Sequence, residues 1–294
     1  MKLMFETFIG VIGGSGLYGI PELEHQEWKT VDTPWGAPSD QLLFGSIRGI
    51  KVVFLPRHGR GHRLSPSIIN YRANIDALKR IGVTDIVSLS ACGSFKEDIV
   101  PGTFVLVDQF IDRTTVRARS FFGDGFVAHV SMARPVADRL VSALDAAMDQ
   151  SDIPRVYGGT YLCIEGPQFS TYAESTLYRD WGCDVIGMTN MPEAKLAREA
   201  EIPYAAVAMV TDFDCWHPDH NDVQMEDILR VMKKNTTQAQ ELIVEFVTKF
   251  PRQRNLCASG ADRALDGSIV TARESWDPQL MKRLDAVAGR VIES

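Results

Sequence analysis

The sequence predicts an α/β fold in which helices surround a central β-sheet. Two observations support this fold class. Short apolar segments alternate with amphipathic ones along the chain. With 294 residues, 45% of them hydrophobic, the chain also has enough apolar material for one large core. Because no repeat, low-complexity tract or convincing linker interrupts it, we expect a single domain over 1–294, with 251–294 as a C-terminal arm and helix.

Seven apolar segments are predicted to be strands, because each is short and mostly uncharged, as in a sheet that is covered on both faces. They are 8–12, 52–56, 85–91, 104–108, 159–166, 184–188 and 204–212.

Helix starts are recognisable between the strands. Ser65-Pro66 opens a predicted helix over 66–81, and a capping box from Thr171 to Glu174 opens one over 171–181. Further helices are predicted over 191–201, over 222–250, where apolar residues recur at three- and four-residue steps, and from 276 onward. The long helix should serve packing.

Charge and cysteine content exclude several classes of protein. Lys and Arg number 31 against 38 Asp and Glu, a net charge of -7, which argues against a nucleic-acid partner. The five cysteines have no metal-ligand spacing or disulfide pattern. No cleavable leader or run of about 18 apolar residues occurs, so we expect a cytoplasmic protein without a membrane partner.

A glycine turn follows the first strand. Gly14, Gly16 and Gly19 formally match the dinucleotide-binding fingerprint, which makes an NAD-dependent oxidoreductase a distant alternative. The match is weak because Pro21 would break the required helix. An ordinary tight turn is also possible. Otherwise, bare backbone N–H groups and the Ser15 hydroxyl can hold an anion.

A basic segment, "LPRHGRGHR", follows the strand over 52–56. A solvated basic turn is the simpler interpretation, but such a concentration of cations in an acidic protein favours a bound phosphate. Arg57 can offer a fork of donors, and His58 a further one.

Two carboxylates, Asp212 and Asp214, stand where the last predicted strand ends, in "VTDFDCWH". Residues i and i+2 of a strand share a face, so both can point at one small ligand, and repulsion with partial burial should raise one pKa. The alternative is a pair of acids that only cap a strand. Likewise, Phe169 is more often a core residue than a base platform, and Glu193 more often a helix N-terminal charge.

Together, six motifs resemble the trimeric purine nucleoside phosphorylase and methylthioadenosine phosphorylase family over about 8–250. They are "GVIGGSGLY", "LPRHGRGHRLSPSIINYRANI", "SACGSFKEDIVPGTFVLVDQFIDRT", "EGPQFSTYAES", "DVIGMTNMPEAKLAREAEIPYA" and "VTDFDCWH", and "ALDGSIVT" extends the likeness to 271.

The resemblance implies a mixed sheet in a nucleoside phosphorylase fold and a homotrimer or a hexamer of paired trimers. It also implies no metal, and inorganic phosphate as co-substrate without another cofactor. The implied reaction is phosphorolysis of S-methyl-5'-thioadenosine to adenine and 5-methylthioribose 1-phosphate. The implied phosphate site consists of Ser15, Arg57, His58, Ser90, Ala91 and Thr189. The implied nucleoside site consists of Met188 at the ribose, Phe169 and Ser170 at the base, and Asp212 and Asp214 at the purine N7 and N6.

Departures from the family pattern bear on specificity. Relatives that cleave inosine and guanosine have Asn at the position of Asp212 and Glu at that of Ser170, so this chain should prefer adenine. A methylthioinosine or general purine nucleoside phosphorylase, a hydrolytic nucleosidase and a non-catalytic purine-binding protein remain alternatives. A neighbouring subunit is implied to supply His129 and either Leu280 or Leu284. Only Cys257 stands where some relatives have Cys-x-Cys, so no disulfide is carried over.

Overall fold

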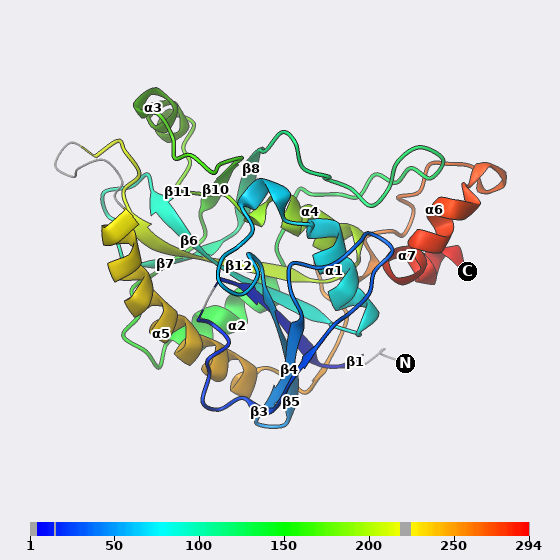
Figure 1. The fold of residues 1–294 in the computed structure, drawn as a ribbon, viewed down its shortest axis with the longest axis horizontal. Coiled ribbons are helices and arrows are strands. Elements are labelled where there is room, and N and C mark those ends of the chain that lie inside the picture. The colour runs from blue at the N-terminus through cyan, green and yellow to red at the C-terminus, as the bar shows by residue number, and fades with distance from the viewer. Residues whose placement is uncertain (1–4, 15, 218–224, 294) are drawn as a thin grey trace.

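The computed structural model describes residues 5–14, 16–217 and 225–293. Within these ranges, eleven strands form one mixed sheet that helices cover on both faces (Figure 1). The predicted α/β class with a mixed central sheet is therefore confirmed.

The main path of the sheet runs through eight strands. In spatial order they are β3 (Glu24–Lys29), β4 (Leu42–Ile47), β5 (Ile50–Pro56), β2 (Phe8–Gly13), β6 (Asp85–Ser94), β11 (Val185–Gly187), β10 (Thr160–Ile164) and β8 (Gln109–Arg113). A branch adds β12 (Tyr204–Asp212), which pairs with β6 and with β7 (Phe104–Val107), and β7 pairs in turn with β9 (Arg155–Tyr157). Outside this sheet, β1 (Phe5–Glu6) pairs with β13 (Gln253–Arg254).

Strand β6 is the centre of the architecture. It runs parallel to β2 on one side and to β12 on the other, and β2 runs parallel to β5. The last residues of β6 pair instead with β11, which is antiparallel to it. The carboxyl ends of β5, β2, β6 and β12 therefore meet at one edge of the sheet.

The predicted strands are all present, and β6 extends beyond its predicted end to Ser94. The strands β3, β4, β8 and β9 were not predicted. β3, with the sequence EHQEWK, is almost wholly exposed at the end of the sheet path and lacks an apolar face. Backbone pairing with β4 stabilises it as a strand, and the hydrophobic periodicity of the sequence does not reveal this pairing.

The helices are α1 (Tyr71–Arg80), α2 (Asp138–Met148), α3 (Tyr172–Asp180), α4 (Asn190–Glu199), α5 (Met225–Lys249), α6 (Pro278–Arg283) and α7 (Asp285–Ile292). Thr171 caps α3 with the predicted capping box. The helix predicted over 66–81 was too long: 66–68 form a single 3-10 turn, and α1 starts only after Asn70, whose side chain accepts from the Ala73 N–H. Helix α2 is not among the predicted helices, although Leu140, Leu144 and Met148 have helical spacing.

The core lies in two main layers. Helices α1, α4 and α7 contribute to the layer on one side of the sheet, and α2 and α5 to the layer on the other. Figure 1 shows the same division, with α1 and α4 on one side and α2 and α5 on the other. The long amphipathic helix α5 has the predicted packing role. Its predicted residues 222–224 lie outside the described residues.

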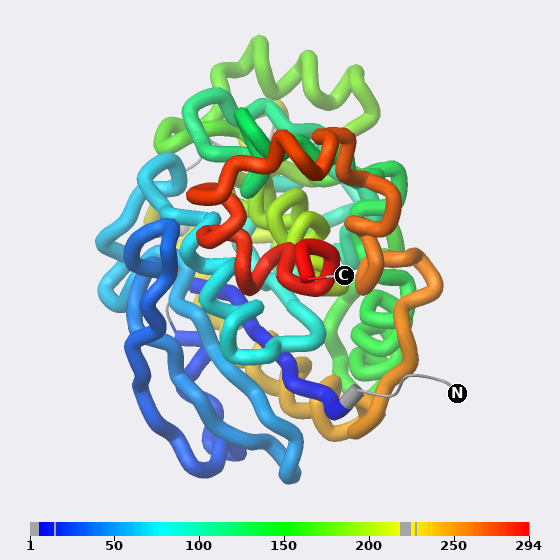
Figure 2. Tube along the Cα trace, turned by 90° about the vertical axis from the view of Figure 1, so that its right-hand side faces the viewer, coloured from blue at the N-terminus to red at the C-terminus, as the bar shows by residue number. Residues whose placement is uncertain are grey.

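The C-terminal arm wraps back over the molecule, so that the final helices lie against α1 (Figure 2). Arg80 of α1 forms an ion pair with Asp285 of α7. The predicted last helix is divided at Leu284 into α6 and α7, and the Leu284 side chain is 0% exposed. The arm thus completes one core layer of this chain.

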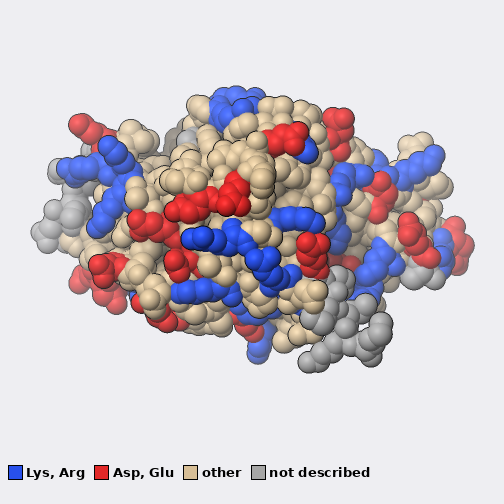
Figure 3. Space-filling view, turned by 90° about the horizontal axis from the view of Figure 1, so that it is seen from below, with Lys and Arg blue, Asp and Glu red and all other residues tan. Residues whose placement is uncertain are grey.

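Surface charge is mixed. On the face shown in Figure 3, acidic and basic side chains are interspersed. Among the described residues, no helix is both long and apolar enough to cross a membrane.

Candidate active site

Most of the predicted site residues lie at the edge where the parallel strands end. The glycine turn follows β2, Arg57 and His58 follow β5, and Asp212 is the last residue of β12. Ser90 and Ala91 lie in β6, beside β12. Such an edge is where open α/β sheets commonly bind ligands.

The glycine turn does not lead into a helix. Within the described residues, Gly16 has φ +98° and the chain continues through a turn to β3. Gln240 of α5 supports this turn by donating to the Gly16 carbonyl at 2.7 Å. A dinucleotide fingerprint needs a helix here, so the oxidoreductase alternative has no structural basis. Ser15 lies outside the described residues.

Arg57 is buried and paired with an acid. Its side chain is 2% exposed, and its Nε donates to Glu193 Oε2 at 2.8 Å. Nη2 donates to Glu193 Oε1 at 3.1 Å and to the Ser88 hydroxyl, and Nη1 donates to the Leu89 carbonyl at 3.1 Å. Four of the five guanidinium N–H groups thus have protein partners, which leaves one Nη1–H rather than the open fork that the sequence suggested.

Glu193 is more than the helix N-terminal charge that its position in the sequence suggests. It lies on α4, is 1% exposed, and accepts hydrogen bonds from Ser88 Oγ at 2.6 Å and Tyr204 Oη at 2.9 Å in addition to Arg57. Burial by itself would lower the pKa of Arg57, but the Glu193 carboxylate outweighs it and holds that pKa above its ordinary value. The pair therefore fixes one cation immediately behind the site edge.

His58 is set up as a hydrogen-bond acceptor. Its Nδ1 lies 2.8 Å from the Leu64 carbonyl oxygen, which can only accept, so the proton belongs on Nδ1. Burial, together with Arg57 and His62, lowers the pKa of His58 to about 4. At neutral pH the ring is then uncharged, and Nε2 has a free lone pair. The sequence predicts His58 as a donor, whereas in the structure its Nε2 is an acceptor.

Thr189 is the chain neighbour of a residue that contacts Ser90. It precedes α4 and is buried, and the next residue, Asn190, accepts a hydrogen bond from Ser90 Oγ at 2.9 Å. Asn190 in turn donates to Tyr204 Oη at 2.8 Å, so this turn is tied to the Glu193 network. Ala91 is the next residue along β6.

Asp212 and Asp214 come together, but not for the predicted reason. Strand β12 ends at Asp212, and Asp214 has φ +53°, so the strand pleat does not relate them. A side-chain turn does: the Asp214 N–H donates to Asp212 Oδ1 at 2.8 Å. Gly93 on β6 permits this approach, because a Cβ there would lie 2.8 Å from Asp212 Oδ1.

Both acids are shifted toward their protonated forms. Burial raises the pKa of Asp212, and burial together with the charge of Asp212 raises the pKa of Asp214 to about 6. Thr211 Oγ1 lies 2.7 Å from Asp212 Oδ2 and 3.1 Å from the Cys92 carbonyl oxygen. Its single proton can satisfy only one of them at a time, so Thr211 can donate to ionised Asp212 or accept from the protonated acid.

Three polar atoms around Asp214 lack a well-formed hydrogen bond within the described residues, although two of them are hydroxyls beside its carboxyl. They are Asp214 Oδ2, Ser170 Oγ and Ser175 Oγ, all inaccessible to solvent in the described structure. Ser170 was predicted at the base; Ser175, on the first turns of α3, was not. Both hydroxyls contribute to lowering the pKa of Asp214, so they lie close to its carboxyl. Buried polar atoms without a well-formed hydrogen bond are uncommon in proteins, and here they leave hydrogen-bonding capacity for a polar ligand.

Phe169 and Met188 lie on neighbouring segments. Phe169 is 44% exposed, which suits a ring that covers a ligand better than a core residue. Met188 is half-buried, and a side chain at Gly166 would overlap its sulfur, at 2.4 Å from the Cβ. The segment that carries Phe169 and the one that carries Met188 are therefore packed against each other.

His129 does not reach the other residues within one chain. It is exposed, and its N–H donates to Ser268 of the C-terminal arm at 2.8 Å. Figure 1 shows the arm at the opposite end of the molecule from α3. Between the two leucines, Leu284 is fully buried in its own core, whereas Leu280 is half-buried. Of the two, Leu280 alone keeps solvent-exposed surface.

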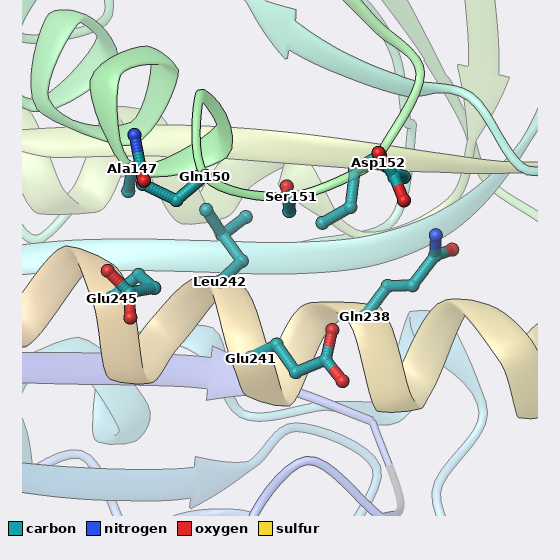
Figure 4. A pocket seen from close by; sticks show the side chains of 9 residues that line it. Ala147, Gln150, Ser151, Asp152, Gln238, Glu241, Leu242 and Glu245 are labelled. Atoms are coloured by element: carbon teal, nitrogen blue, oxygen red, sulfur yellow. The ribbon is translucent and has the colours of Figure 1, made fainter.

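A surface hollow between α2 and α5 is unrelated to this edge (Figure 4). It measures about 410 Å³ and is lined by polar and acidic side chains, among them Gln150, Asp152 and Glu241. It contains none of the predicted site residues, and the chemistry lies elsewhere.

We expect the cost of ionising Asp214 to appear in the stability of the protein. With its pKa raised from 3.8 to about 6, the folded protein holds this proton more tightly than the unfolded chain does. The free energy of unfolding should therefore fall as pH rises through this window, by at most about 3 kcal/mol. Asp214→Asn cannot titrate, so its stability relative to wild type should improve between pH 4 and pH 7. Urea titrations at both values measure this difference, and an unchanged difference would contradict it.

Comparison with known proteins gives a consistent result. Residues 8–248 match the family model described as the phosphorylase superfamily. The chain is similar to S-methyl-5'-thioadenosine phosphorylase of Bradyrhizobium diazoefficiens, with 61% identity over 289 residues, 98% of this chain and 99% of the relative. It is also similar to a crystal structure of methylthioadenosine phosphorylase from an antarctic soil metagenomic library, with TM-score 0.88, 47% identity and coverage of 96% and 99%. A third likeness is to the Schistosoma mansoni methylthioadenosine phosphorylase in complex with adenine, with TM-score 0.76, 37% identity and coverage of 83% and 91%.

Proposed function

The chain belongs to the phosphorylase superfamily, and we propose that it cleaves S-methyl-5'-thioadenosine with phosphate to give adenine and 5-methylthioribose 1-phosphate. The observation that carries this proposal is the buried pair Asp212 and Asp214, with raised pKa values, at the same sheet edge as Arg57 and His58. The relatives with 50–61% identity that bear the name of this activity support it.

Asp212 and Asp214 would recognise the base. Adenine presents an acceptor at N7 and a donor at N6. A protonated carboxyl can donate to N7, and a carboxylate oxygen can accept from N6, so a pair with raised pKa values suits both positions. Ser170 and Ser175 would orient Asp214, and Phe169 would cover the ring. A 6-oxopurine would turn its carbonyl oxygen toward acceptors, which is unfavourable.

The phosphate site would lie at the glycine turn. We propose that phosphate contacts Ser15, the remaining Nη1–H of Arg57, His58 Nε2, and the segments of Ser90–Ala91 and Thr189. The Arg57–Glu193 pair is overall neutral, so its contribution is a fixed donor direction rather than excess positive charge. A preorganised donor of this kind does not have to reorient during the reaction.

In the reaction, the N-glycosidic bond breaks and its electron pair goes to the purine. Asp212 transfers its proton to N7, which stabilises the leaving base, and solvent later restores that proton. A phosphate oxygen forms the new bond to C1′ on the opposite face. Holding the anion in place can lower the activation barrier by roughly 7–11 kcal/mol in favourable cases. Phosphate is the co-substrate, and we propose that no metal or organic cofactor is needed.

We further propose that the protein acts in the cytoplasm as a single-domain homotrimer, or as a hexamer of paired trimers. The position of His129 supports assembly, since it can take part in a site only across a subunit boundary. Leu280 would line the same methylthio pocket. Light scattering should give at least three times the 32.7 kDa chain mass. A monomer that keeps full activity at nanomolar dilution would contradict this expectation.

The function is tested by adenine release from S-methyl-5'-thioadenosine with and without phosphate. We expect release to depend on phosphate and to saturate with it. Release that is equal without phosphate would indicate a hydrolytic nucleosidase, and binding without release would indicate a purine-binding protein.

A further inference from the structure

Arg117 is a buried arginine that is not among the proposed site residues but contacts the segments that carry them. It follows β8 in the chain, and its side chain is 1% exposed. Its Nε donates to Glu165 Oε1 at 2.8 Å, and its Nη2 donates to the carbonyl oxygen of Glu165 at 2.7 Å and of Ile164 at 3.4 Å. Its Nη1 lies 2.6 Å from the Met188 carbonyl oxygen, 2.7 Å from that of Met191 and 3.1 Å from Tyr71 Oη.

All of these contacts are to the protein itself. The five N–H groups of the guanidinium face six acceptors, so none is left for a substrate. Four of the acceptors are backbone carbonyls, and they come from two segments only. Arg117 therefore acts on the path of the backbone rather than on a bound molecule.

The first segment carries the proposed anion and ribose contacts. Met188 and Met191 bracket Thr189 and Asn190 in the turn over 188–191, where the chain passes from β11 into the first residues of α4 and Met191 has non-helical backbone angles. By holding the carbonyl before this pair and the carbonyl after it, one guanidinium fixes both ends of the turn. The orientation of Thr189 depends on that turn.

The second segment carries the proposed base contacts. Ile164 ends β10, and Glu165 stands directly before Gly166 and the segment that leads to Phe169 and Ser170. The side chain of Glu165 also accepts from Ser67 Oγ and from the Thr115 N–H, each at 2.6 Å. Burial alone would raise the pKa of Glu165, but these hydrogen bonds and the one from Arg117 outweigh it and lower the pKa to about 2.

We propose that Arg117 and Glu165 are a positioning pair that sets the distance between the phosphate side and the base side of the site. The inference rests on the proposed function, because the two sides must hold the two halves of one nucleoside. Reaction rates are sensitive to such spacing: a misplacement of about 1 Å can cost about 100-fold. Lysine cannot replace the arginine, since a compact ammonium cannot reach two separate segments with a planar set of donors.

The test compares Arg117→Lys with Arg254→Lys. Arg254 is an equally buried arginine that pairs with Asp85 and Asp262, and Asp85 begins β6 at the opposite edge of the sheet. We expect similar losses of melting temperature in the two variants. For Arg117→Lys alone we expect kcat to fall at least 30-fold and the KM of both phosphate and nucleoside to rise.

A second pair of variants tests the same positioning role if Arg117→Lys does not fold. Glu165→Gln keeps the side-chain shape but loses the charge, and Asp262→Asn is its matched control. Only Glu165→Gln should lower kcat, by about tenfold. If Arg117→Lys and Glu165→Gln keep kcat and both KM values within threefold of their controls, the positioning role is wrong. A wild-type protein without phosphate-dependent turnover would instead overturn the proposed function, so the two failures are distinguishable.

Discussion

Replacing Asp212 and Asp214 together by asparagine should move the substrate preference from S-methyl-5'-thioadenosine toward S-methyl-5'-thioinosine. In the proposed site, the carboxyl groups of Asp212 and Asp214 would face N7 and N6, and a 6-oxo group would meet acceptors. Sites that pair with one polar group can reject the mismatched analogue by around 10⁴-fold. Asparagine supplies an amide N–H donor at both positions, and the oxygen of a 6-oxo group can accept a hydrogen bond from it.

The decisive quantity is kcat/KM for S-methyl-5'-thioadenosine divided by kcat/KM for S-methyl-5'-thioinosine. Loss of an acid catalyst alone would slow both substrates together and leave the ratio unchanged. We expect the ratio to fall by at least 100-fold in the double variant. The matched control is Asp112→Asn. Asp112 lies in strand β8, and its carboxylate pairs with Lys195 of α4. This variant should keep the wild-type ratio. A wild type that prefers the inosine analogue would refute the assignment of both aspartates.

Arg57→Ala should raise the KM for phosphate at least tenfold while the KM for the nucleoside changes little. The structure adds a second consequence. Because Arg57 is the buried partner of Glu193, its removal leaves a carboxylate without a counter-charge, and we expect a loss of about 3–5 kcal/mol of stability.

The control must therefore share the stability loss. Arg254→Ala removes another buried arginine of two ion pairs, at the far edge of the sheet, and should lower stability without changing the KM for phosphate. Initial rates over a range of phosphate concentrations compare the two variants at a temperature where both are folded. Equal phosphate KM values in both would show that Arg57 only supports the fold.

The fold was largely predictable because most of its strands correspond to short apolar segments of the sequence. Apolar runs such as 204–212 are short and uncharged, and the capping box at Thr171 is a local signal with one structural solution. Two elements were not predicted correctly because contacts beyond the local pattern determine them. β3 was not predicted, since it depends on pairing with its partner strand β4. The start of α1 was placed too early, since the 3-10 turn over 66–68 ends before Asn70 caps the helix.

The site was predictable as a set of residue types, but not as a set of contacts. The partner of Arg57 lies 136 residues away in the sequence, so its pairing with Glu193 cannot be seen in the basic segment itself. Arg117 gave no signal, because one arginine in a loop is usually solvated. The predicted closeness of Asp212 and Asp214 depended on strand geometry, whereas a side-chain turn produces it.

The central claim is that phosphate, not water, takes the place of the purine at C1′. The most direct measurement follows the products of S-methyl-5'-thioadenosine by ³¹P NMR and mass spectrometry in ¹⁸O-labelled water with unlabelled phosphate. We predict one new phosphate monoester for each adenine released, with no ¹⁸O at C1 of the sugar. Free 5-methylthioribose carrying ¹⁸O, formed in step with adenine, would contradict the proposed phosphorolysis.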